Sequence, residues 1–314
     1  MNKRYIGIDI GGTAVKIGYV TDEGELLATV SERVDFDHYQ TPIIVTVKKA
    51  VDRFLASENI PLTDLSGFGI SATGQIDTRK GVVSGTAGHI ANWTQTPIAQ
   101  IFKDSYHLPV SVVNDANCAL MGECWLGAAR GYKDVVMVTI GTGIGGGILT
   151  DGRLLTGVRG IAGELGHFPV RVDGELCSCG NRGCYEKYAS TTALVNTVRS
   201  RAGELIPDIP PEHIDGRLIF DRIDKGNATL QTVVSEWISS ITAGLVGLIH
   251  IFNPQLILIG GGVSQQEKIF IEPLREQIFS SAMPGFCKDL TVESAQLGNN
   301  AGLLGAIACL KKMF

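Results

Sequence analysis

One local pattern occurs twice in this chain: an apolar strand, a glycine-rich turn and a second strand. The first copy covers residues 5–20 around the turn Gly11-Gly12-Thr13, and the second covers 134–149 around the turn at 141–147. Two strands joined by a glycine-rich turn form a hairpin. Because an internal repeat means that one structural unit occurs more than once, the sequence predicts two related α/β domains facing each other.

The remaining elements follow from apolar periodicity and turn signals. Short apolar runs predict further strands at 26–34, 67–71, 110–114 and 256–259. Helical spacing predicts helices at 43–57, 117–126, 191–201, 230–252 and 302–311. The stretch 201–215 contains three prolines and little periodicity, which is typical of a surface loop. We place the first domain at 1–117, with the C-terminal helix at about 301–314 packing back on it, and the larger second domain at 118–300.

The composition is that of an ordinary globular chain. Of 314 residues, 44% are hydrophobic and 19% are charged, which is enough for two domains with good cores. The net charge of -5 leaves no electrostatic footprint for nucleic acid. The N-terminus leads directly into a strand, and no apolar run reaches the length of a membrane span. We therefore expect a cytoplasmic protein with neither a nucleic-acid partner nor a membrane partner.

Glycine-rich turns at strand ends favour phosphate binding, because glycine lets backbone N–H groups approach phosphate oxygens closely. An ordinary hairpin turn is the alternative for any one of them, but this chain has three. Thr13 adds a hydroxyl donor, and Asp9 is placed to hold magnesium through water. The residues predicted to bind phosphate or nucleotide are Asp9, Gly11, Gly12, Thr13, Gly141, Thr142, Gly143, Gly145, Gly260, Gly261 and Gly262.

A zinc site is predicted from one histidine and three cysteines in the middle of the chain: His167, Cys177, Cys179 and Cys184. One nitrogen and three sulfur ligands complete a tetrahedral shell, which is the mark of a structural site. Buried free cysteines and a disulfide are the alternatives. The seven cysteines form an odd set, and without a signal peptide we expect a reducing compartment, which disfavours a disulfide.

Asp115 is the best candidate for a general base. It follows the apolar strand at 110–114, so it should lie at a strand end. Its alternative duty is to cap the helix at 117–126, which is common for aspartate. The residues alone leave both duties open, and one side chain can perform both.

Five motifs carry a family resemblance: Asp9-Ile-Gly-Gly-Thr13, Asn114-Asp115, Gly141-Thr-Gly-Ile-Gly-Gly146, Glu164-Leu-Gly-His167 and Cys177-Ser-Cys-Gly-Asn-Arg-Gly-Cys-Tyr-Glu186. Together they resemble the ROK family of repressors, open reading frames and sugar kinases. The resemblance covers nearly the whole chain. It implies the actin-like ATPase fold, also called the sugar kinase/Hsp70 fold, in which two α/β domains close on a ligand cleft that holds ATP, magnesium and a sugar.

The same resemblance implies roles for individual residues. It makes Asp115 the base that accepts the proton of a sugar hydroxyl. It implies sugar contacts for the following residues: Gly74, Asn92, Asn114, Asp115, Glu164, His167 and Glu186. His167 would bind zinc through one ring nitrogen and keep the other for the sugar.

Two positions depart from the family pattern or stay open. Many members carry lysine directly after Gly-Gly-Thr, where this chain has Ala14, with Lys16 two residues later on the same side of the strand. Whether Lys16 replaces that lysine stays open. His89 lies either beside the sugar or at a turn.

The resemblance implies an ATP-dependent kinase that phosphorylates a hydroxyl of a hexose or N-acetylhexosamine, with glucose or N-acetylmannosamine leading. One alternative is a sugar-responsive transcriptional regulator, disfavoured because the chain reaches Asp9 almost at once. The other is a non-catalytic sugar sensor, disfavoured because each catalytic role is filled. The expected cofactors are ATP, Mg²⁺ and structural Zn²⁺. Dimers are common in the family, so we expect a homodimer.

Overall fold

The computed structural model describes residues 3–85 and 90–313, which form two compact units. The first unit comprises the chain up to Gly131, the segment Leu154–Gly163 and the stretch from Asn299 onward. The second comprises Tyr132–Arg153 and Glu164–Gly298. A boundary after residue 117 falls inside helix α3 (Asp115–Leu126), which lies in the first unit.

A five-stranded sheet forms the centre of the first unit, in the order β3-β2-β1-β4-β7. Its strands are β1 (Arg4–Ile10), β2 (Ala14–Thr21), β3 (Leu26–Arg33), β4 (Leu65–Ala72) and β7 (Val110–Asn114). The first three strands are antiparallel, whereas β1, β4 and β7 run parallel. The carboxyl ends of these parallel strands lie along one edge, with Asp9 beside Ser71 and Ala72 beside Asn114.

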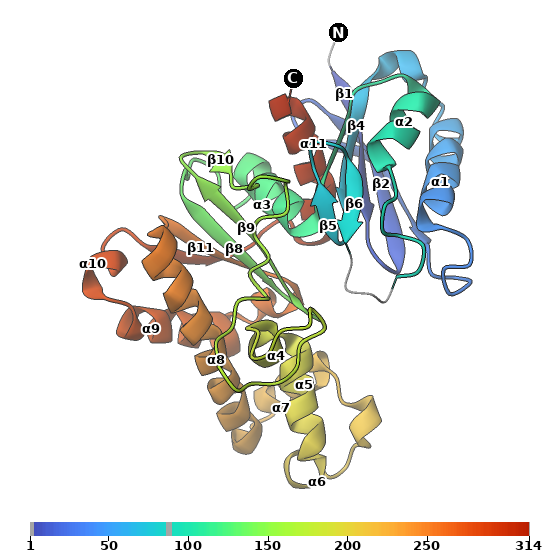
Figure 1. The fold of residues 1–314 in the computed structure, drawn as a ribbon. Helices are drawn as coiled ribbons and strands as arrows, with labels where there is room; N and C mark the ends of the chain where they lie inside the picture. Colours follow the sequence, from blue (N-terminus) through green and yellow to red (C-terminus); the bar gives the residue numbers. More distant parts are fainter. Residues whose placement is uncertain (1–2, 86–89, 314) are drawn as a thin grey trace. The chain divides into compact units, whose positions relative to one another are not determined.

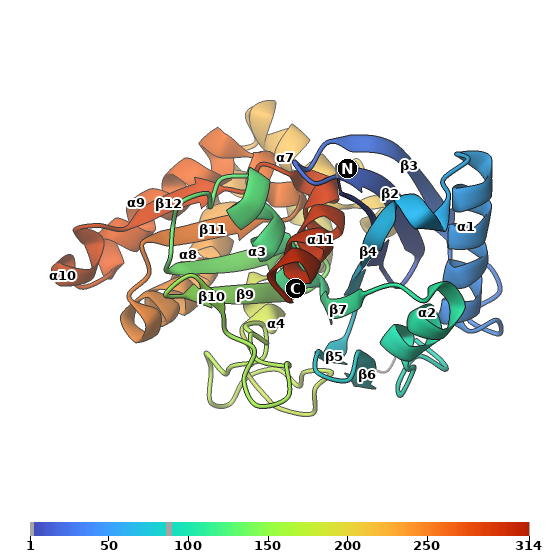
Figure 2. The same cartoon turned by 90° about the horizontal axis from the view of Figure 1, so that it is seen from above.

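Helices cover both faces of this sheet. α1 (Ile43–Ser57) and α2 (Ile98–Tyr106) lie on one face, and α3 and α11 (Ala301–Met313) lie on the other (Figures 1 and 2). The residues of α1 and α2 that point to the sheet are the apolar ones, including Val47, Val51 and Phe102. A small hairpin, β5 (Gln75–Asp77) and β6 (Val82–Gly85), follows β4.

Glycines let α11 approach its neighbours closely. A Cβ on Gly69 of β4 would lie 2.5 Å from the backbone of Ala306, and a Cβ on Gly122 of α3 would lie 2.5 Å from the carbonyl oxygen of Ala301. No side chain fits at those distances. The glycines therefore explain how the C-terminal helix packs backbone to backbone against β4 and α3.

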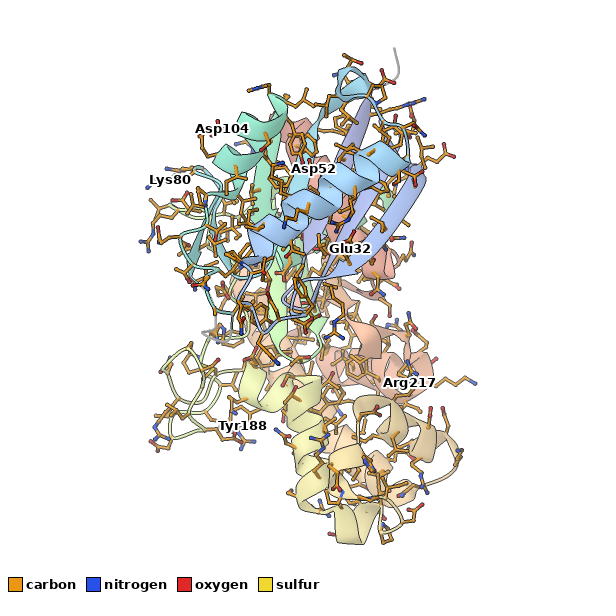
Figure 3. The ribbon with its side chains drawn as sticks, turned by 90° about the vertical axis from the view of Figure 1, so that its right-hand side faces the viewer. Glu32, Asp52, Lys80, Asp104, Tyr188 and Arg217 are labelled. Atoms are coloured by element: carbon orange, nitrogen blue, oxygen red, sulfur yellow. The ribbon has the colours of Figure 1, made fainter. Side chains whose placement is uncertain are left out.

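Polar contacts join α1 to its neighbours in the same unit. Arg53 of α1 forms an ion pair with Glu32 of β3, and Tyr106 of α2 donates a 2.7 Å hydrogen bond to Asp52 of α1. Figure 3 labels the two acidic partners, Glu32 and Asp52. Burial raises the pKa of the Tyr106 phenol, and Asp52 raises it further. The phenol is therefore held as a hydrogen-bond donor.

The second unit contains another five-stranded sheet, in the order β10-β9-β8-β11-β12. Its strands are β8 (Val135–Ile140), β9 (Ile144–Thr150), β10 (Arg153–Leu154), β11 (Leu256–Gly260) and β12 (Thr291–Ser294). β8 and β9 form the second predicted hairpin, and β11 runs parallel to both β8 and β12. One of the two predicted hairpins therefore lies in each unit, which confirms the predicted repeat.

The helices of the second unit build its core. They are α4 (Glu186–Ala189), α5 (Thr191–Ser200), α6 (Ala202–Leu205), α7 (Gly216–Asp224), α8 (Ala228–Phe252), α9 (Glu272–Ser281) and α10 (Pro284–Cys287). The long helix α8 buries Trp237, Ile241 and Leu245 among the apolar residues of this unit.

Two sequence-based expectations need correction. Among the described residues, α8 is long and apolar enough to cross a membrane. However, 56% of its 18-residue apolar stretch is buried inside the protein, as in the core helix of a globular domain. The stretch 201–215 is not a plain surface loop. It contains α6 and a 3₁₀ turn at Pro211–His213, and it buries Leu205, Ile206 and Ile214. Its prolines break the periodicity that would have revealed these contacts.

Candidate functional site

The turn between β1 and β2 presents the first glycine pair. The Gly11 amide donates to the carbonyl oxygen of Ala14 at 2.9 Å, which closes the turn. Tyr39 donates its hydroxyl to the carbonyl oxygen of Gly12, also at 2.9 Å. Thr13 is exposed, and its carbonyl oxygen accepts from Val34. The backbone of this turn is therefore fixed from both sides.

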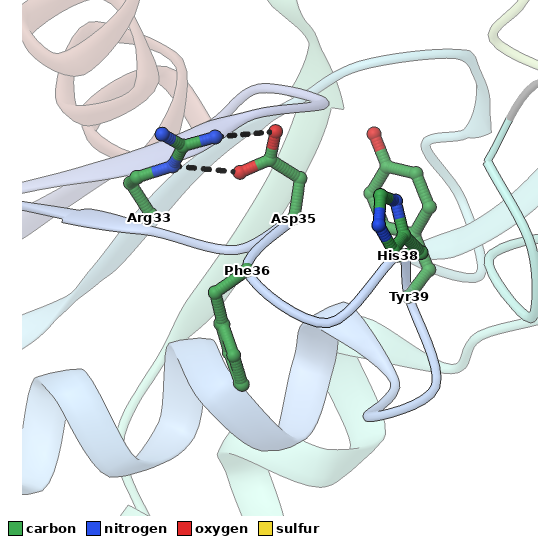
Figure 4. Close-up of a pocket in the computed structure, with 5 residues that line it drawn as sticks. All are labelled: Arg33, Asp35, Phe36, His38 and Tyr39. Carbon is green, nitrogen blue, oxygen red and sulfur yellow. Dashed lines mark hydrogen bonds and ion pairs between the residues drawn. The ribbon is translucent and has the colours of Figure 1, made fainter.

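A hollow lies beside Tyr39, lined by Arg33, Asp35, Phe36, His38 and Tyr39 (Figure 4). Arg33 and Asp35 pair through two 3.0 Å hydrogen bonds, and the guanidinium lowers the pKa of Asp35. His38 and Tyr39 both have positive φ, of 54° and 62°. Such angles are uncommon outside glycine, and here they accompany the contact of Tyr39 with the turn.

Asp9 lies near the end of β1, and polar groups surround its carboxylate. Ser71 of β4 donates to its Oδ1 at 2.6 Å. A Cβ on Gly302 of α11 would lie 2.9 Å from the carboxyl carbon and from both carboxyl oxygens. Burial raises the pKa of Asp9, whereas Ser71 and the charge of Lys16 lower it. The arrangement holds a carboxylate at the sheet edge, as a magnesium ligand acting through water would require.

Lys16 lies opposite Asp9 in the register of β1 and β2. Its ammonium donates to Asn300 Oδ1 at 2.5 Å and approaches the carbonyl oxygen of Asn299 at 3.4 Å. It is thus tethered where α11 begins. Lys16 therefore lies close to Asp9.

Asn114 and Asp115 mark the step from β7 to α3. The helix cap is Asn114, whose Oδ1 accepts from the amides of Ala116 and Asn117 at 3.0 and 3.2 Å. Asp115 is instead the first helical residue, and its Oδ1 accepts from the Ala116 amide and from Asn114 Nδ2. Capping thus falls mainly to Asn114, and these bonds fix the orientation of the Asp115 carboxylate.

Gly74 joins this group, because its carbonyl oxygen accepts a 3.0 Å bond from Asn114 Nδ2 and its φ of 96° favours glycine. Asn92 is exposed with a φ of 58°, and within the described residues no hydrogen bond connects it to Gly74 or Asn114. His89 lies outside the described residues. Trp93 is buried and donates to the carbonyl oxygen of Thr73, so it has a packing role.

The second glycine turn is fixed by residues that lie far along the chain. The Gly141 carbonyl oxygen accepts from the Thr191 amide at 2.9 Å, and the Ile144 amide donates to Glu186 Oε2 at 2.9 Å. A Cβ on Gly143 would collide with that same carboxylate oxygen. Glycine at 143 is therefore what allows the Glu186 carboxylate to lie against the turn.

The third glycine turn lies beside the second. β11 runs parallel to β8, with Gly260 opposite Thr139. Gly261 has a φ of 89°, and a Cβ there would collide with the carbonyl oxygen of Ile140. Two of the three predicted turns therefore occupy one edge of the second unit's sheet.

The segment from Glu164 to His167 packs directly on the second turn. A Cβ on Gly166 would lie 2.5 Å from the carbonyl oxygen of Ile144, and the Gly166 carbonyl oxygen accepts from the Glu186 amide at 2.9 Å. Burial raises the pKa of Glu164, His167 lowers it and Glu186 raises it. Glu164, His167 and Glu186, the sugar-contact residues predicted in this half of the chain, are therefore close neighbours.

The predicted zinc ligands converge. One ligand atom from each of His167, Cys177, Cys179 and Cys184 lies within 4.8 Å of the others. Nδ1 of His167 is 3.5 Å from the Cys177 sulfur, and the sulfurs of Cys179 and Cys184 are also 3.5 Å apart. Ligands on a tetrahedral zinc are separated by roughly 3.5–3.8 Å, whereas a disulfide needs about 2.05 Å. The donor set fits zinc, and none of the three cysteines is in a disulfide.

Electrostatics also favours a cation among these sulfurs. Burial, with Cys179 and Cys177 adding to it, raises the pKa of Cys184 to about 12. Burial also acts to raise the pKa of Cys177, but hydrogen bonds from Cys179, His167 and Cys184 lower it to about 7. Neighbouring thiolates repel one another, so ionisation of the full set requires a positive charge at their centre.

Several contributors were not predicted from the sequence. Ser71, Tyr39 and Gly302 contact the first turn or Asp9, and Thr191 holds the second turn. Only Ser71 had an available signal, since it ends a strand that runs parallel to β1. The others are brought in by packing between distant segments.

Comparisons with known proteins agree with this geometry. The ROK family model matches residues 5–313. Glucokinase of Thermotoga maritima is 33% identical, over 98% of each chain, and beta-glucoside kinase of Listeria monocytogenes is 36% identical, over 95% of this chain and 94% of that protein. The structure of a ROK family glucokinase from Streptomyces griseus, in complex with glucose and AMPPNP, superposes with a TM-score of 0.83 at 33% identity, over 98% of this chain and 99% of that one. These likenesses confirm the predicted fold class.

Proposed function

The chain belongs to the ROK family, and we propose that it is an ATP-dependent sugar kinase with Asp115 as general base. Transfer of a phosphoryl group to a hydroxyl needs a cradle for the phosphates, charge neutralisation and a carboxylate that accepts the hydroxyl proton. The observation that carries the proposal is the shared sheet edge of the first unit, where Asp9 lies one residue before the end of β1, and Asn114 ends the parallel strand β7 with Asp115 directly after it.

Asp115 is suited to accept a proton because its carboxylate is oriented. Asn114 Nδ2 and the Ala116 amide both donate to its Oδ1, at 2.9 and 2.8 Å. Asn114 is in turn held by Gly74 and by its own capping bonds. A base that is already held in one rotamer loses no side-chain conformational entropy when it aligns with the incoming hydroxyl. Phosphoryl transfer then requires only that this hydroxyl faces the γ-phosphate.

The glycine turns would bind the nucleotide. Gly12 and Thr13 offer amides and a hydroxyl, and the turns at 141–143 and 260–262 offer more amides at one sheet edge. When bound, magnesium would neutralise charge on the phosphates, with Asp9 holding it through water. Glu164, His167 and Glu186 would accept or donate hydrogen bonds to vicinal sugar hydroxyls, with Asn114 and Asn92 as further contacts.

Zinc would act as a structural ion. Apart from two isolated bridges, residues 164–185 lie outside the regular strands and helices, so a four-ligand ion would supply the missing order. Because Nδ1 of His167 faces Cys177, the opposite ring nitrogen would be left for a sugar hydroxyl. The metal would thus orient a sugar ligand without touching the reacting atoms.

Glucose leads as substrate, with N-acetylmannosamine second and beta-glucosides third; curated relatives are named glucokinase and beta-glucoside kinase, and a similar solved structure from Listeria monocytogenes is described as a putative N-acetylmannosamine kinase. We also propose that the protein acts as a cytoplasmic homodimer. Light scattering of the purified protein at micromolar concentration would report the dimer directly, and a monomer mass would exclude it.

The test is an ADP-release assay with ATP and magnesium against glucose, N-acetylmannosamine, N-acetylglucosamine, mannose, fructose and cellobiose. We expect strong turnover on one sugar. Asp115→Asn should lower kcat by roughly 10²–10⁴-fold, the usual worth of a general base, while sugar binding persists. Sugar binding without turnover by the unmodified protein would instead identify a sensor, and a near-normal kcat for Asp115→Asn would remove the base assignment.

A further inference from the structure

We infer that Glu186 is a positioning residue for the nucleotide as well as a sugar ligand, so that one carboxylate couples the two substrates. This inference rests on the proposed function and deepens it. Glu186 Oε2 accepts the Ile144 amide at 2.9 Å, and this amide belongs to the glycine-rich turn that follows β8. The sequence and the family resemblance gave Glu186 only a sugar contact.

The contact is built into the backbone on both sides. Gly143 leaves room for the carboxylate, because any Cβ at that position would collide with Oε2. The main chain of Glu186 is itself held, since its amide donates to Gly166 at 2.9 Å and its carbonyl oxygen accepts from Ser190 at 3.2 Å. The carboxylate therefore approaches the turn from a fixed position at the start of α4.

The turn relies on this anchor. Gly141 donates to Gly143 at 3.0 Å and accepts from Thr191 at 2.9 Å, which fixes its first half. Ile144 begins β9, where its bond to Glu186 fixes the second half. A glycine-rich turn has much conformational freedom to lose when it binds phosphate, so an anchor at each end lowers the cost of ordering it.

The two oxygens of Glu186 have different surroundings. Oε2 lies against Gly143, whereas Oε1 would be 3.9 Å from a Cβ at that position and thus points away from the turn. Glu164 lies near enough for the charge of Glu186 to raise its pKa. Oε1 is therefore the oxygen that the turn leaves for the sugar in this inference, and a hydroxyl bound there would fix the carboxylate that holds the turn.

The experiment measures AMPPNP binding with magnesium and without any sugar, by isothermal titration. A residue that served only the sugar would leave this affinity unchanged. Loss of a charge-assisted hydrogen bond should weaken AMPPNP binding in Glu186→Ala by roughly tenfold or more. Glu186→Gln keeps an oxygen that can accept from Ile144, so its affinity should return to within about threefold of the unmodified protein.

Glu276→Gln is the matched control, because Glu276 is exposed on α9 and no hydrogen bond within the described residues joins it to the turn. It should leave AMPPNP affinity unchanged. Zinc content and melting temperature check that each variant is folded. In addition, the sugar identified by the kinase assay should tighten AMPPNP binding to the unmodified protein, and this effect should disappear in Glu186→Ala, as linkage requires of a coupling residue.

The outcomes separate this inference from the proposed function. Equal AMPPNP affinity for Glu186→Ala and the unmodified protein would overturn the inference alone, since nucleotide binding itself would be established. Equal weakening in Glu186→Ala and Glu186→Gln would also overturn it, because the shared acceptor would then not matter. If the unmodified protein bound no AMPPNP at all, the proposed function would fail and the inference with it.

Discussion

Alanine at Gly302 tests whether Asp9 is held as the structure shows, without changing Asp9 itself. The new Cβ would lie 2.9 Å from the Asp9 carboxyl carbon and both its oxygens. Ordinary carbon contacts are about 3.5–4.0 Å, so the carboxylate would have to move by roughly half an ångström or more. That shift would lengthen the 2.6 Å bond from Ser71 to the limit of the normal range or beyond it, and the full loss of such a charge-assisted hydrogen bond costs about 1.5–3 kcal/mol.

Alanine also favours a helix over glycine by about 0.5–1 kcal/mol, so Gly302→Ala should destabilise by a net 1–2 kcal/mol, by rough subtraction. Gly247→Ala in α8 is the control, because a Cβ there meets nothing within 4 Å and only the helix gain applies. Relative to the unmodified protein, Gly302→Ala should therefore lower the melting temperature and Gly247→Ala should raise it, so that the two variants differ by several degrees.

Kinetics provides the second readout for Gly302→Ala. A displaced Asp9 should raise the magnesium concentration needed for half-maximal activity, whereas Gly247→Ala should leave it unchanged. If Gly302→Ala stabilised the protein as much as Gly247→Ala and kept the same magnesium dependence, the packing of α11 against Asp9 would not be what holds the carboxylate.

Two further predictions concern the neighbouring features. Cys179→Ala should remove zinc and weaken sugar binding. Cys287 lies outside the cluster, so Cys287→Ala should keep one zinc per chain, as measured by elemental analysis. An unchanged zinc content in Cys179→Ala would refute the zinc site. Tyr39→Phe removes the donor to Gly12, a bond worth about 0.5–1.5 kcal/mol. It should raise the KM for ATP about two- to tenfold with little change in kcat, and an unchanged KM would show that the turn does not need this bond.

Long periodic elements could be predicted closely from the sequence. The helix expected at 43–57 is α1, residue for residue, and the strand expected at 110–114 is β7. Their boundaries follow from local chemistry, since Pro42 precedes α1 and Asn114 caps the next helix. The helix α2 was missed although Ile98, Phe102 and Tyr106 recur at four-residue spacing, because nine residues are too few for a clear period.

Site residues could be predicted where the chemistry of the residue itself determines its role. They were missed where the role depends on a contact with a residue that is distant in the sequence. The four residues of the candidate zinc site lie within 18 residues of each other and were selected by their spacing, and the structure brings their ligand atoms together. The sequence analysis considered Asp115 as the helix cap, whereas the structure gives this role to Asn114, one residue earlier. Asparagine and aspartate both cap helices well, so residue type alone does not separate them. Glu186 and Ile144 are 42 residues apart, and no local pattern connects them.

The two hairpins show why the repeat could be predicted from the sequence, whereas the side chains that hold each turn in place could not. Both copies join two strands through glycines, and that requirement is written in the local sequence. The first turn is then fixed by a tyrosine from the loop after β3, and the second by Glu186 and Thr191 from the start of α4 and α5. The same backbone is thus held by unrelated side chains, a neutral phenol in one unit and a carboxylate in the other. Only the second anchor belongs to the proposed sugar ligands, so only the second turn can sense the sugar through its own anchor.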